Sequence, residues 1–184
     1  WSRGEYTLAN NQQDDLTVMP SYGVSYRTDD HGGTFATSTA IAGPALSKVG
    51  NIERTTDVDQ FSFQTGAGRV AVTAAPSARS PNLHGLLSLY DESGARLVST
   101  KSADTSGGTQ PASFAMILPT GKYYVSVDGI GEGDPVNTGY SDYGSLGQYT
   151  LTGPLPSDSA WLPTPAAAYS WTNVANWASN TIPL

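Results

Sequence analysis

The stretch SFAMILPTGKYYVSVDG, Ser113 to Gly129, decides which fold the sequence predicts. Apolar residues occupy every second position on both sides of a Pro-Thr-Gly segment: Phe114, Met116 and Leu118 before it, and Tyr123, Val125 and Val127 after it. Alternation at a period of two is typical of a strand with one buried face, and Pro and Gly favour a turn. The stretch therefore predicts an antiparallel hairpin.

The same alternation recurs along the chain between Asp57 and Gly153. The residues that carry it are Phe61 and Phe63, then Val70, Val72 and Ala74, then Leu87, Leu89 and Leu97 around a DESG turn, and finally Tyr149 and Leu151. Longer loops are expected at 75–81, 102–111 and 130–147. Strands joined by turns without intervening helices predict an all-β fold, an antiparallel, jelly-roll-like β-sandwich of about seven to nine strands.

The composition agrees with such a fold and excludes several partners. The 184 residues include 20 Gly, 12 Pro and 10 Tyr, and only 14% are charged. The net charge of −7 argues against nucleic acid and anionic membranes as partners. No apolar run reaches the roughly 18–20 residues of a transmembrane helix, so no membrane insertion is expected. Cysteine is absent, so disulfides do not stabilise the chain.

Three regions are expected. Residues 1–28 form an irregular N-terminal tail that packs through Trp1, Tyr6 and Leu16; residues 29–153 form the sandwich domain; residues 154–184 form a Pro/Ala linker and a Trp/Asn-rich tail. Because the chain begins at Trp1 without an initiator Met, we expect it to be a processed or excised part of a longer protein.

Two aspartates at the start of one predicted strand suggest a metal site. In TTDVDQFSF, Thr55 to Phe63, Asp57 and Asp59 lie on one side of an extended backbone, roughly 6–7 Å apart. Such like charges repel unless a cation or hydrogen-bond donors lie between them, and Ca²⁺ takes six to eight oxygen ligands. Asp29 and Asp30 can add ligands if the segment before the first strand folds against the same edge. The alternative is that the acids are turn formers or solvated edge charges.

Four segments, taken in order, resemble the bacterial pre-peptidase C-terminal domain: DVDQFSF, LLSLYDESGARL, LPTGKYYVSV and GQYTLTG. The segment DDHGGTFATSTAI, Asp29 to Ile41, resembles the acidic segment that opens such domains. The resemblance implies a calcium-binding β-sandwich appended to a secreted peptidase or other extracellular hydrolase. Where that family often reads Glu-Pro-Asn-Asp, this chain has Asp30-His-Gly-Gly33, so carbonyls or water must replace two side-chain oxygens and a weaker site is expected.

Two further resemblances concern the ends of the chain. WSRGEY followed by NNQQDDL resembles the stretch after the Met-turn of secreted metzincin-type zinc metallopeptidases. It implies that residues 1–28 end an upstream catalytic domain and that the parent protein is a zinc metallopeptidase. WTNVANW resembles a Trp/Asn motif of repetitive bacterial surface proteins.

Motifs for catalysis are missing from the sequence. His31 and His84 are the two histidines, and neither belongs to a His-Glu-x-x-His motif. There is no Gly-x-Ser-x-Gly segment that would present a serine nucleophile. The chain is therefore not expected to be an enzyme.

Two functions remain open, and both place the chain outside the cell. The first is a calcium-binding accessory domain of a secreted peptidase, which aids stability, maturation or targeting to protein substrate. The second is a carbohydrate-binding module that binds polysaccharide through exposed aromatic rings. Tyr124 on the outer face of the second hairpin, and Tyr140 and Tyr143 on the long loop, are the candidate substrate-binding residues. Each of them has the alternative of packing against the sheet.

Overall fold

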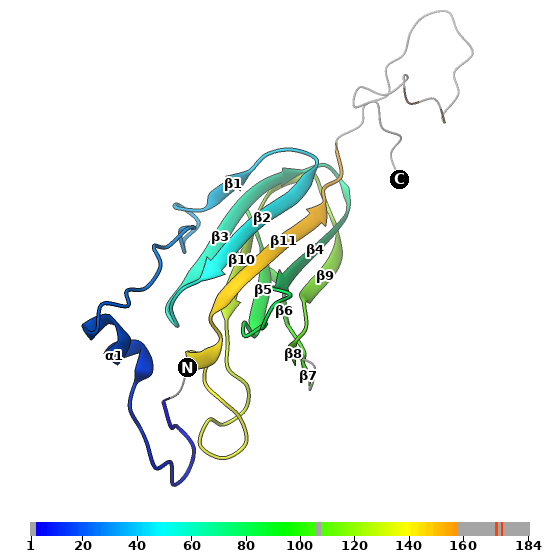
Figure 1. Ribbon diagram of the computed structural model, residues 1–184. Coiled ribbons are helices and arrows are strands. Elements are labelled where there is room, and N and C mark those ends of the chain that lie inside the picture. Colours follow the sequence, from blue (N-terminus) through cyan, green and yellow to red (C-terminus); the bar gives the residue numbers. More distant parts are fainter. Residues whose placement is uncertain (1–2, 106–107, 158–171, 173, 175–184) are drawn as a thin grey trace, which may run out of the picture.

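A computed structural model describes residues 3–105, 108–157, 172 and 174, and it contains two packed β-sheets (Figure 1). The first sheet has the strand order β1 (Thr39–Ile41), β3 (Val58–Thr65), β10 (Gly121–Gly129), β5 (Gly85–Asp91) and β6 (Arg96–Lys101). The second has the order β2 (Ala45–Ile52), β11 (Gly147–Pro154), β4 (Gly68–Pro76) and β9 (Ala112–Leu118). The predicted all-β sandwich is confirmed.

One strand pair departs from the antiparallel prediction. β1 pairs with β3 in parallel, with Thr39 opposite Phe61 and Ile41 opposite Phe63. The chain leaves β1, passes through β2 in the other sheet and then returns to the first sheet as β3. This excursion lets two strands close in sequence run in the same direction, which a tight hairpin does not allow.

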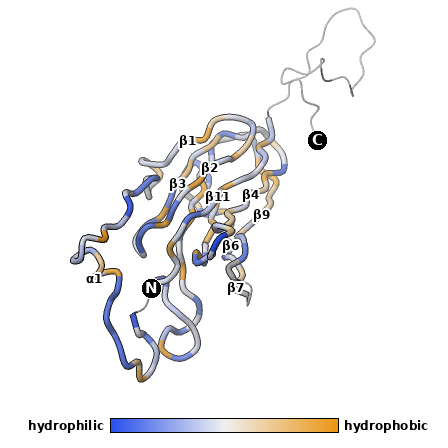
Figure 2. Tube along the Cα trace, viewed as in Figure 1, coloured by the Kyte–Doolittle hydropathy of each residue, from blue (hydrophilic) through white to orange (hydrophobic). Residues whose placement is uncertain are grey.

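Side chains from the inner faces of both sheets form one hydrophobic core. The predicted inward residues of β3, β4, β5, β10 and β11 are buried, and Phe61, Val70, Val72, Leu87, Leu89, Val125, Val127 and Leu151 are 0% exposed. Hydrophobic and hydrophilic residues alternate along the labelled strands β4 and β11 in Figure 2. Leu87 and Leu89 of β5 lie opposite Val127 and Val125 of β10 in the middle of the first sheet. The predicted hairpin of residues 113–129 is wrong, because β9 pairs with β4 in the second sheet, whereas β10 pairs with β3 and β5 in the first. The Pro-Thr-Gly turn therefore leads the chain from one sheet to the other.

The predicted role of Leu97 is wrong. A register shift between Leu89 and Tyr90 places Val98 opposite Leu89, so Val98 packs against the core and Leu97 is 39% exposed. A bulge of this kind inserts one residue into a strand and reverses which residues face inward. The two predicted loops after β6 and β10 also contain short elements, namely β7 (Asp104–Thr105) with β8 (Gly108–Thr109), and the 3₁₀ helix η1 (Asp142–Gly144).

The N-terminal region contains a short helix that the sequence did not predict, α1 (Asp15–Ser21). Asp14 caps it by accepting a hydrogen bond from the Thr17 backbone N–H. Leu16 is buried in the core, as expected, whereas Tyr6 is 58% exposed, so its predicted packing is wrong. Trp1 and the predicted tail motif of Trp171 and Trp177 lie outside the described residues.

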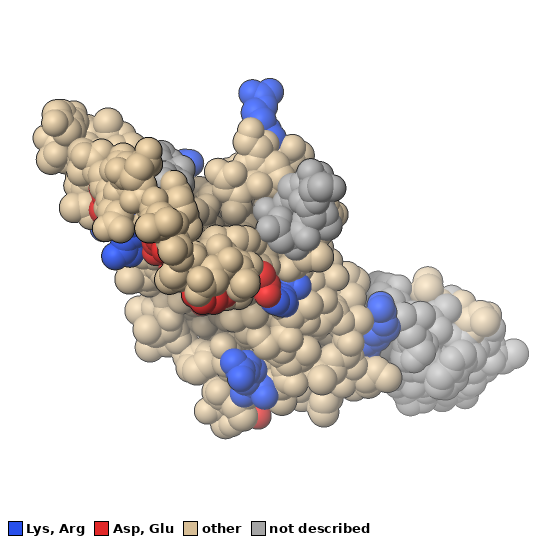
Figure 3. All heavy atoms as spheres, turned by 90° about the horizontal axis from the view of Figure 1, so that it is seen from below, with Lys and Arg blue, Asp and Glu red and all other residues tan. Residues whose placement is uncertain are grey.

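Charged side chains are scattered on the face seen in Figure 3, where basic and acidic groups lie side by side without a large patch of either sign. None of the described helices has the length and hydropathy needed to cross a membrane.

Candidate metal centre

Three carboxylates converge where β3 begins. Asp57 immediately precedes β3, Asp59 is its second residue, and Asp29 belongs to the segment that leads to β1. One carboxylate oxygen of each lies within 4.8 Å of the others. The structure therefore brings together three of the four residues that the sequence predicts as metal ligands.

Asp59 is the most buried member of this group, with 0% exposure. It occupies the same face of β3 as Phe61 and so points into the sandwich. Its Oδ2 accepts a hydrogen bond of 2.5 Å from the Tyr149 hydroxyl on β11, whereas its Oδ1 has no hydrogen-bond partner among the described residues. Burial raises the pKa of Asp59 to about 8; the Tyr149 bond opposes that shift, and the charges of Asp57 and Asp30 add to it.

Gly50 on β2 makes room for the pair of Tyr149 and Asp59. A Cβ atom at this position would lie 2.3 Å from the Tyr149 hydroxyl oxygen and 2.8 Å from Asp59 Oδ2. Gly50 lies opposite Tyr149 in the second sheet, so the hydroxyl passes over bare backbone to reach the first sheet. A glycine at this position is required by a close approach of side chains.

Backbone hydrogen bonds orient the other two carboxylates. Asp57 Oδ2 accepts from the Glu53 N–H at 3.0 Å, and Asp29 Oδ1 accepts from the His31 N–H at 3.0 Å. The His31 ring contacts Phe61 with 4.6 Å between ring centroids, and its Nδ1 lies 2.9 Å from Thr39 Oγ1. These contacts hold the segment that carries Asp29 against β3.

Asp30 lies outside the group of three. Its Oδ1 accepts a long hydrogen bond of 3.4 Å from the Asn51 N–H, so its side chain reaches towards β2. Consecutive residues of an extended segment point to opposite sides, which separates Asp30 from Asp29. Burial is the main cause of the raised pKa values of Asp59 and Glu53, and the negative charge of Asp30 raises both further.

The two glycines that replace the expected Asn-Asp pair have a steric reason. A Cβ on Gly32 would lie 2.5 Å from Thr37 Oγ1 and 2.7 Å from the Thr37 carbonyl oxygen, and one on Gly33 would lie 2.9 Å from the Val58 carbonyl oxygen. The carbonyl of Gly32 accepts a hydrogen bond from the Gln60 N–H. The segment therefore packs on β3 through bare backbone, and side-chain oxygens have no room at either position.

Glu53 is an acidic residue near the centre that the sequence analysis missed. It follows the last residue of β2 and is 7% exposed, and its Oε2 has no hydrogen-bond partner among the described residues. Burial raises its pKa to about 7; a hydrogen bond from Asn51 opposes the shift, and the neighbouring Asp57 adds to it. The buried residues of β2 alternate with a period of two, as Leu46, Gly50 and Ile52 show. This pattern would place Glu53, the next residue, on the outer face of the strand, so it does not predict that Glu53 is buried.

The three tyrosines predicted to bind substrate do not form an exposed aromatic surface. Tyr124 lies on the outer face of β10 as expected, but the Phe35 ring covers it at 4.8 Å between centroids and leaves it 8% exposed. Tyr143 is 7% exposed; its hydroxyl donates to Asp14 Oδ1 and accepts from the Leu16 N–H. Tyr140 is 37% exposed, and its hydroxyl lies 3.2 Å from His84 Nδ1.

Both histidines are engaged in structural contacts. His31 lies in the acidic segment, and its Nε2 lies 3.1 Å from the Val49 carbonyl oxygen. His84 immediately precedes β5 and is 2% exposed, with Nε2 3.0 Å from the Ser102 carbonyl oxygen. The group of potential metal ligands found in the described part of the chain is composed of aspartates alone.

The spacing of the three carboxylates fits a hard divalent cation. Two oxygens on opposite sides of one Ca²⁺ lie about 4.6–5.2 Å apart, because each Ca–O distance is about 2.3–2.6 Å. The three oxygens, which lie within 4.8 Å of one another, satisfy this limit. A cation would also give the unpartnered Asp59 Oδ1 a ligand bond in place of the water it lost on folding.

No protein-family model matches the chain, and none of the curated proteins matches it. Among solved structures, the chain is similar to the pre-peptidase C-terminal domain of a collagenase from Bacillus anthracis, with 16% identity, coverage of 68% of this chain and 99% of that chain, and a TM-score of 0.43. The domain that the sequence resembles is thus also found among its structural neighbours.

Two other neighbours are a periplasmic inhibitor of g-type lysozyme from Aeromonas hydrophila and a CBM35 from Cellvibrio japonicus. The first has 11% identity, covers 64% of this chain and 95% of that chain, and has a TM-score of 0.43. The second has 15% identity, covers 72% and 84%, and has a TM-score of 0.33. Likenesses this distant carry no function to the chain, so the assignment below depends on the metal centre and the sequence.

Proposed function

We propose that this chain is a non-catalytic, calcium-binding accessory domain of a secreted bacterial peptidase. The observation that carries the proposal is the convergence of Asp29, Asp57 and Asp59, with the buried Oδ1 of Asp59 left without a hydrogen-bond partner among the described residues. Three carboxylates in one place repel each other, and the repulsion disappears when they share a dication.

Calcium would join two parts of the chain that are far apart in the sequence. Asp29 belongs to the segment before β1, whereas Asp57 and Asp59 begin β3, and Tyr149 ties Asp59 to β11 in the second sheet. One ion would therefore connect the N-terminal segment with both sheets. In a chain without cysteine, such a link would do what a disulfide does in other extracellular domains.

The peptidase context rests on the resemblance of the sequence segments to pre-peptidase C-terminal domains and of residues 1–28 to the stretch after a Met-turn. In that context, the parent protein is a zinc metallopeptidase, the upstream catalytic domain is the intramolecular partner, and the chain acts outside the cell. The carbohydrate-binding alternative loses support because Tyr124 and Tyr143 are buried.

Equilibrium dialysis or calorimetric titration of the chain with Ca²⁺ tests the calcium site, with Mg²⁺ as the competing ion. The site should take one Ca²⁺ per chain and prefer it to Mg²⁺, because Mg²⁺ demands a smaller octahedral shell and gives up water reluctantly. The variant Asp91→Asn is the matched control, since Asp91 is the last residue of β5 and its carboxylate accepts from Ser93 and Ala95 in the following turn. It should bind calcium like the original chain.

A further inference from the structure

The second sheet ends in an edge strand, β9, that no other described strand covers. β9 pairs with β4 on one side, and no strand among the described residues pairs with its other side. It lies at the right-hand side of the sandwich in Figure 1. The open side of an edge strand presents a row of backbone N–H and C=O groups, which can pair with a strand of another chain.

Two of the other edge strands have features that hinder such pairing. β1 is three residues long. β6 begins with Arg96 and ends with Lys101, and its pairing with β5 is interrupted by the bulge. Short length, charged side chains and bulges are the usual means by which proteins prevent their sheet edges from associating.

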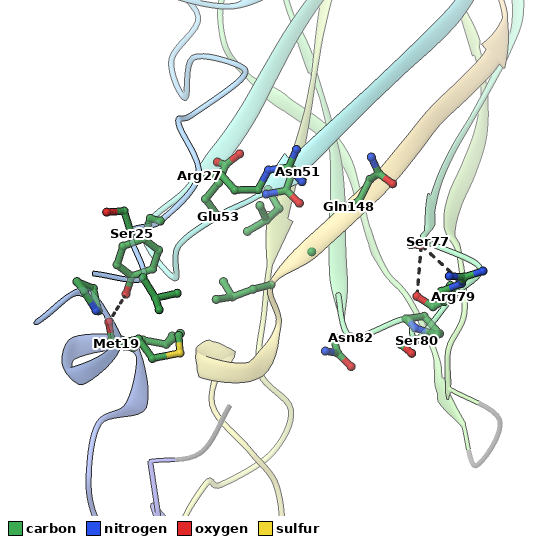
Figure 4. A pocket seen from close by; sticks show the side chains of 18 residues that line it. Met19, Ser25, Arg27, Asn51, Glu53, Ser77, Arg79, Ser80, Asn82 and Gln148 are labelled. Atoms are coloured by element: carbon green, nitrogen blue, oxygen red, sulfur yellow. Dashed lines mark hydrogen bonds between the residues drawn. The ribbon is translucent and has the colours of Figure 1, made fainter. Parts of the chain in front are cut away.

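The edge of β2 is covered by the N-terminal segment. His31 Nε2 lies 3.1 Å from the Val49 carbonyl oxygen, and Asp30 Oδ1 accepts a hydrogen bond from the Asn51 N–H. Figure 4 shows the same segment beside the end of this strand, with Arg27 next to Asn51. These contacts occupy backbone groups that would otherwise be available to another strand.

β9 has none of these protective features. Its sequence, ASFAMIL, contains no charged residue, proline or glycine. Ile117, on its outer face, is 80% exposed. Phe114 and Met116, on its inner face, are only partly buried. Val72 and Val70, which lie opposite them on β4, are 0% exposed. The core is therefore incompletely covered along this edge.

We propose that β9 pairs with β9 of a second copy of this chain, in antiparallel orientation about a two-fold axis at Ala115. In this register Phe114 of one copy lies opposite the partner's Met116 on the inner face, where sulfur and aromatic ring make a favourable contact. Each copy thus covers the apolar side chains that the other leaves partly exposed. The pairing is isologous, so it closes after two copies and forms a dimer.

A second copy suits this edge better than an unrelated extended polypeptide. β9 of another copy is already an ordered strand, whereas a flexible segment would lose conformational entropy when it pairs. The dimer should nevertheless be weak. An interface of one strand pair is small, and two chains of net charge −7 repel each other. We therefore expect a dissociation constant in the micromolar range or weaker.

The dimer surface is separate from the metal centre and from the pocket drawn in Figure 4. β2, which the N-terminal segment covers, and β9 are opposite edges of the second sheet. The pocket, of about 440 Å³, lies between α1, the start of β11 and the loop after β4, and no residue of β9 lines it. Dimerisation should therefore be the same in calcium and in EGTA.

Sedimentation velocity of the full chain, from about 1 µM to about 1 mM, measures the association. The dimer fraction should rise with concentration and with salt, which screens the repulsion between the chains. Ala115→Lys should weaken dimerisation about tenfold or more, because two like charges would lie opposite each other. Thr152→Lys is the matched control: it adds the same charge at an exposed position of β11, away from the edge, and should dimerise like the original chain.

Cysteine cross-linking tests the register. The chain contains no cysteine, so a disulfide-linked dimer can form only through an introduced residue. Mild oxidation should link Ala115→Cys readily and Thr152→Cys hardly at all, because only position 115 meets its equivalent at the axis.

Three results would overturn the proposal. The first is a chain that stays monomeric over the whole concentration range. The second is a dimer that persists unchanged in Ala115→Lys, because another surface would then hold the copies together. The third is a monomeric chain whose β9 amide NMR signals shift when an unrelated extended peptide is added, which would assign the edge to a different polypeptide.

Discussion

The hydroxyl of Tyr149 should control how tightly the centre binds calcium, although Tyr149 is not a ligand in this account. The substitution Tyr149→Phe removes the 2.5 Å hydrogen bond to Asp59 Oδ2 and leaves the ring, which is 1% exposed, in place. The pKa of Asp59 is about 8, so at pH 7 the ion-free chain holds this carboxyl mostly protonated, whereas calcium requires the carboxylate.

The size of the effect follows from this difference in charge. A hydrogen bond between neutral groups contributes about 0.5–1.5 kcal/mol, and one to a charged group contributes about 1.5–3 kcal/mol. Loss of the hydroxyl should thus lower the free energy of unfolding by about 1 kcal/mol without calcium and by about 1 kcal/mol more with calcium. The additional loss corresponds to a calcium Kd raised about fivefold, since about 1.4 kcal/mol is a factor of ten.

Urea unfolding in EGTA and in calcium, together with calorimetric titration, measures both quantities. Tyr123→Phe is the control: Tyr123 is also buried, but its hydroxyl donates to the Pro119 carbonyl oxygen, away from the acids. It should lower stability equally with and without calcium. If Tyr149→Phe left the calcium Kd unchanged, or lowered it, the idea that this hydroxyl stabilises the ionised Asp59 would be refuted.

Three further results are expected. In EGTA, stability should fall as the pH rises from about 4 to about 8, because burial raises the pKa values of Asp59 and Glu53 and the native state holds protons that the unfolded chain has released. Saturating calcium should remove the part of this fall that is due to Asp59, as pH-dependent denaturation will show. Asp14→Ala should cost about 1 kcal/mol by removing the cap of α1 and should make the N-terminal segment easier to cleave in limited proteolysis. Leu87→Ala should cost about 2–5 kcal/mol in urea unfolding through the cavity it leaves, with the calcium Kd unchanged.

The sequence predicted the strands well because their signal is local. The burial of Val70 and Val72, and of Val125 and Val127, can be predicted from the order of residues alone, because one face of each strand is buried. The bulge beside Leu89 escaped prediction because one inserted residue reverses the pattern without changing the composition. The parallel pairing of β1 escaped it because pairing depends on the path of the chain through the other sheet.

The candidate site was predictable only in part for a similar reason. The spacing of Asp57 and Asp59 placed them on one side of a strand, and the structure adds Asp29 to them. Tyr149 joins the centre through a contact between the two sheets, which no local pattern reveals. Glu53 joins it through a local bond, from its N–H to Asp57 four residues further on, but the period-two pattern does not indicate such a bond across a turn. Tyr124 was expected to be exposed from its place on the outer face, but a segment far away in sequence brings Phe35 over it.

The central claim, that the three aspartates bind one calcium ion, is tested most directly by thermal melts of the chain and of Asp59→Asn in calcium and in EGTA. An ion that binds the native state alone adds about 2.7 kcal/mol at one hundred times its Kd, which corresponds to a rise in Tm of roughly 5–10 °C for a domain of this size. The account predicts that rise for the original chain and little of it for Asp59→Asn, which should still fold in EGTA because the substitution relieves repulsion between carboxylates. Superimposable melts of the original chain in calcium and in EGTA would contradict the claim.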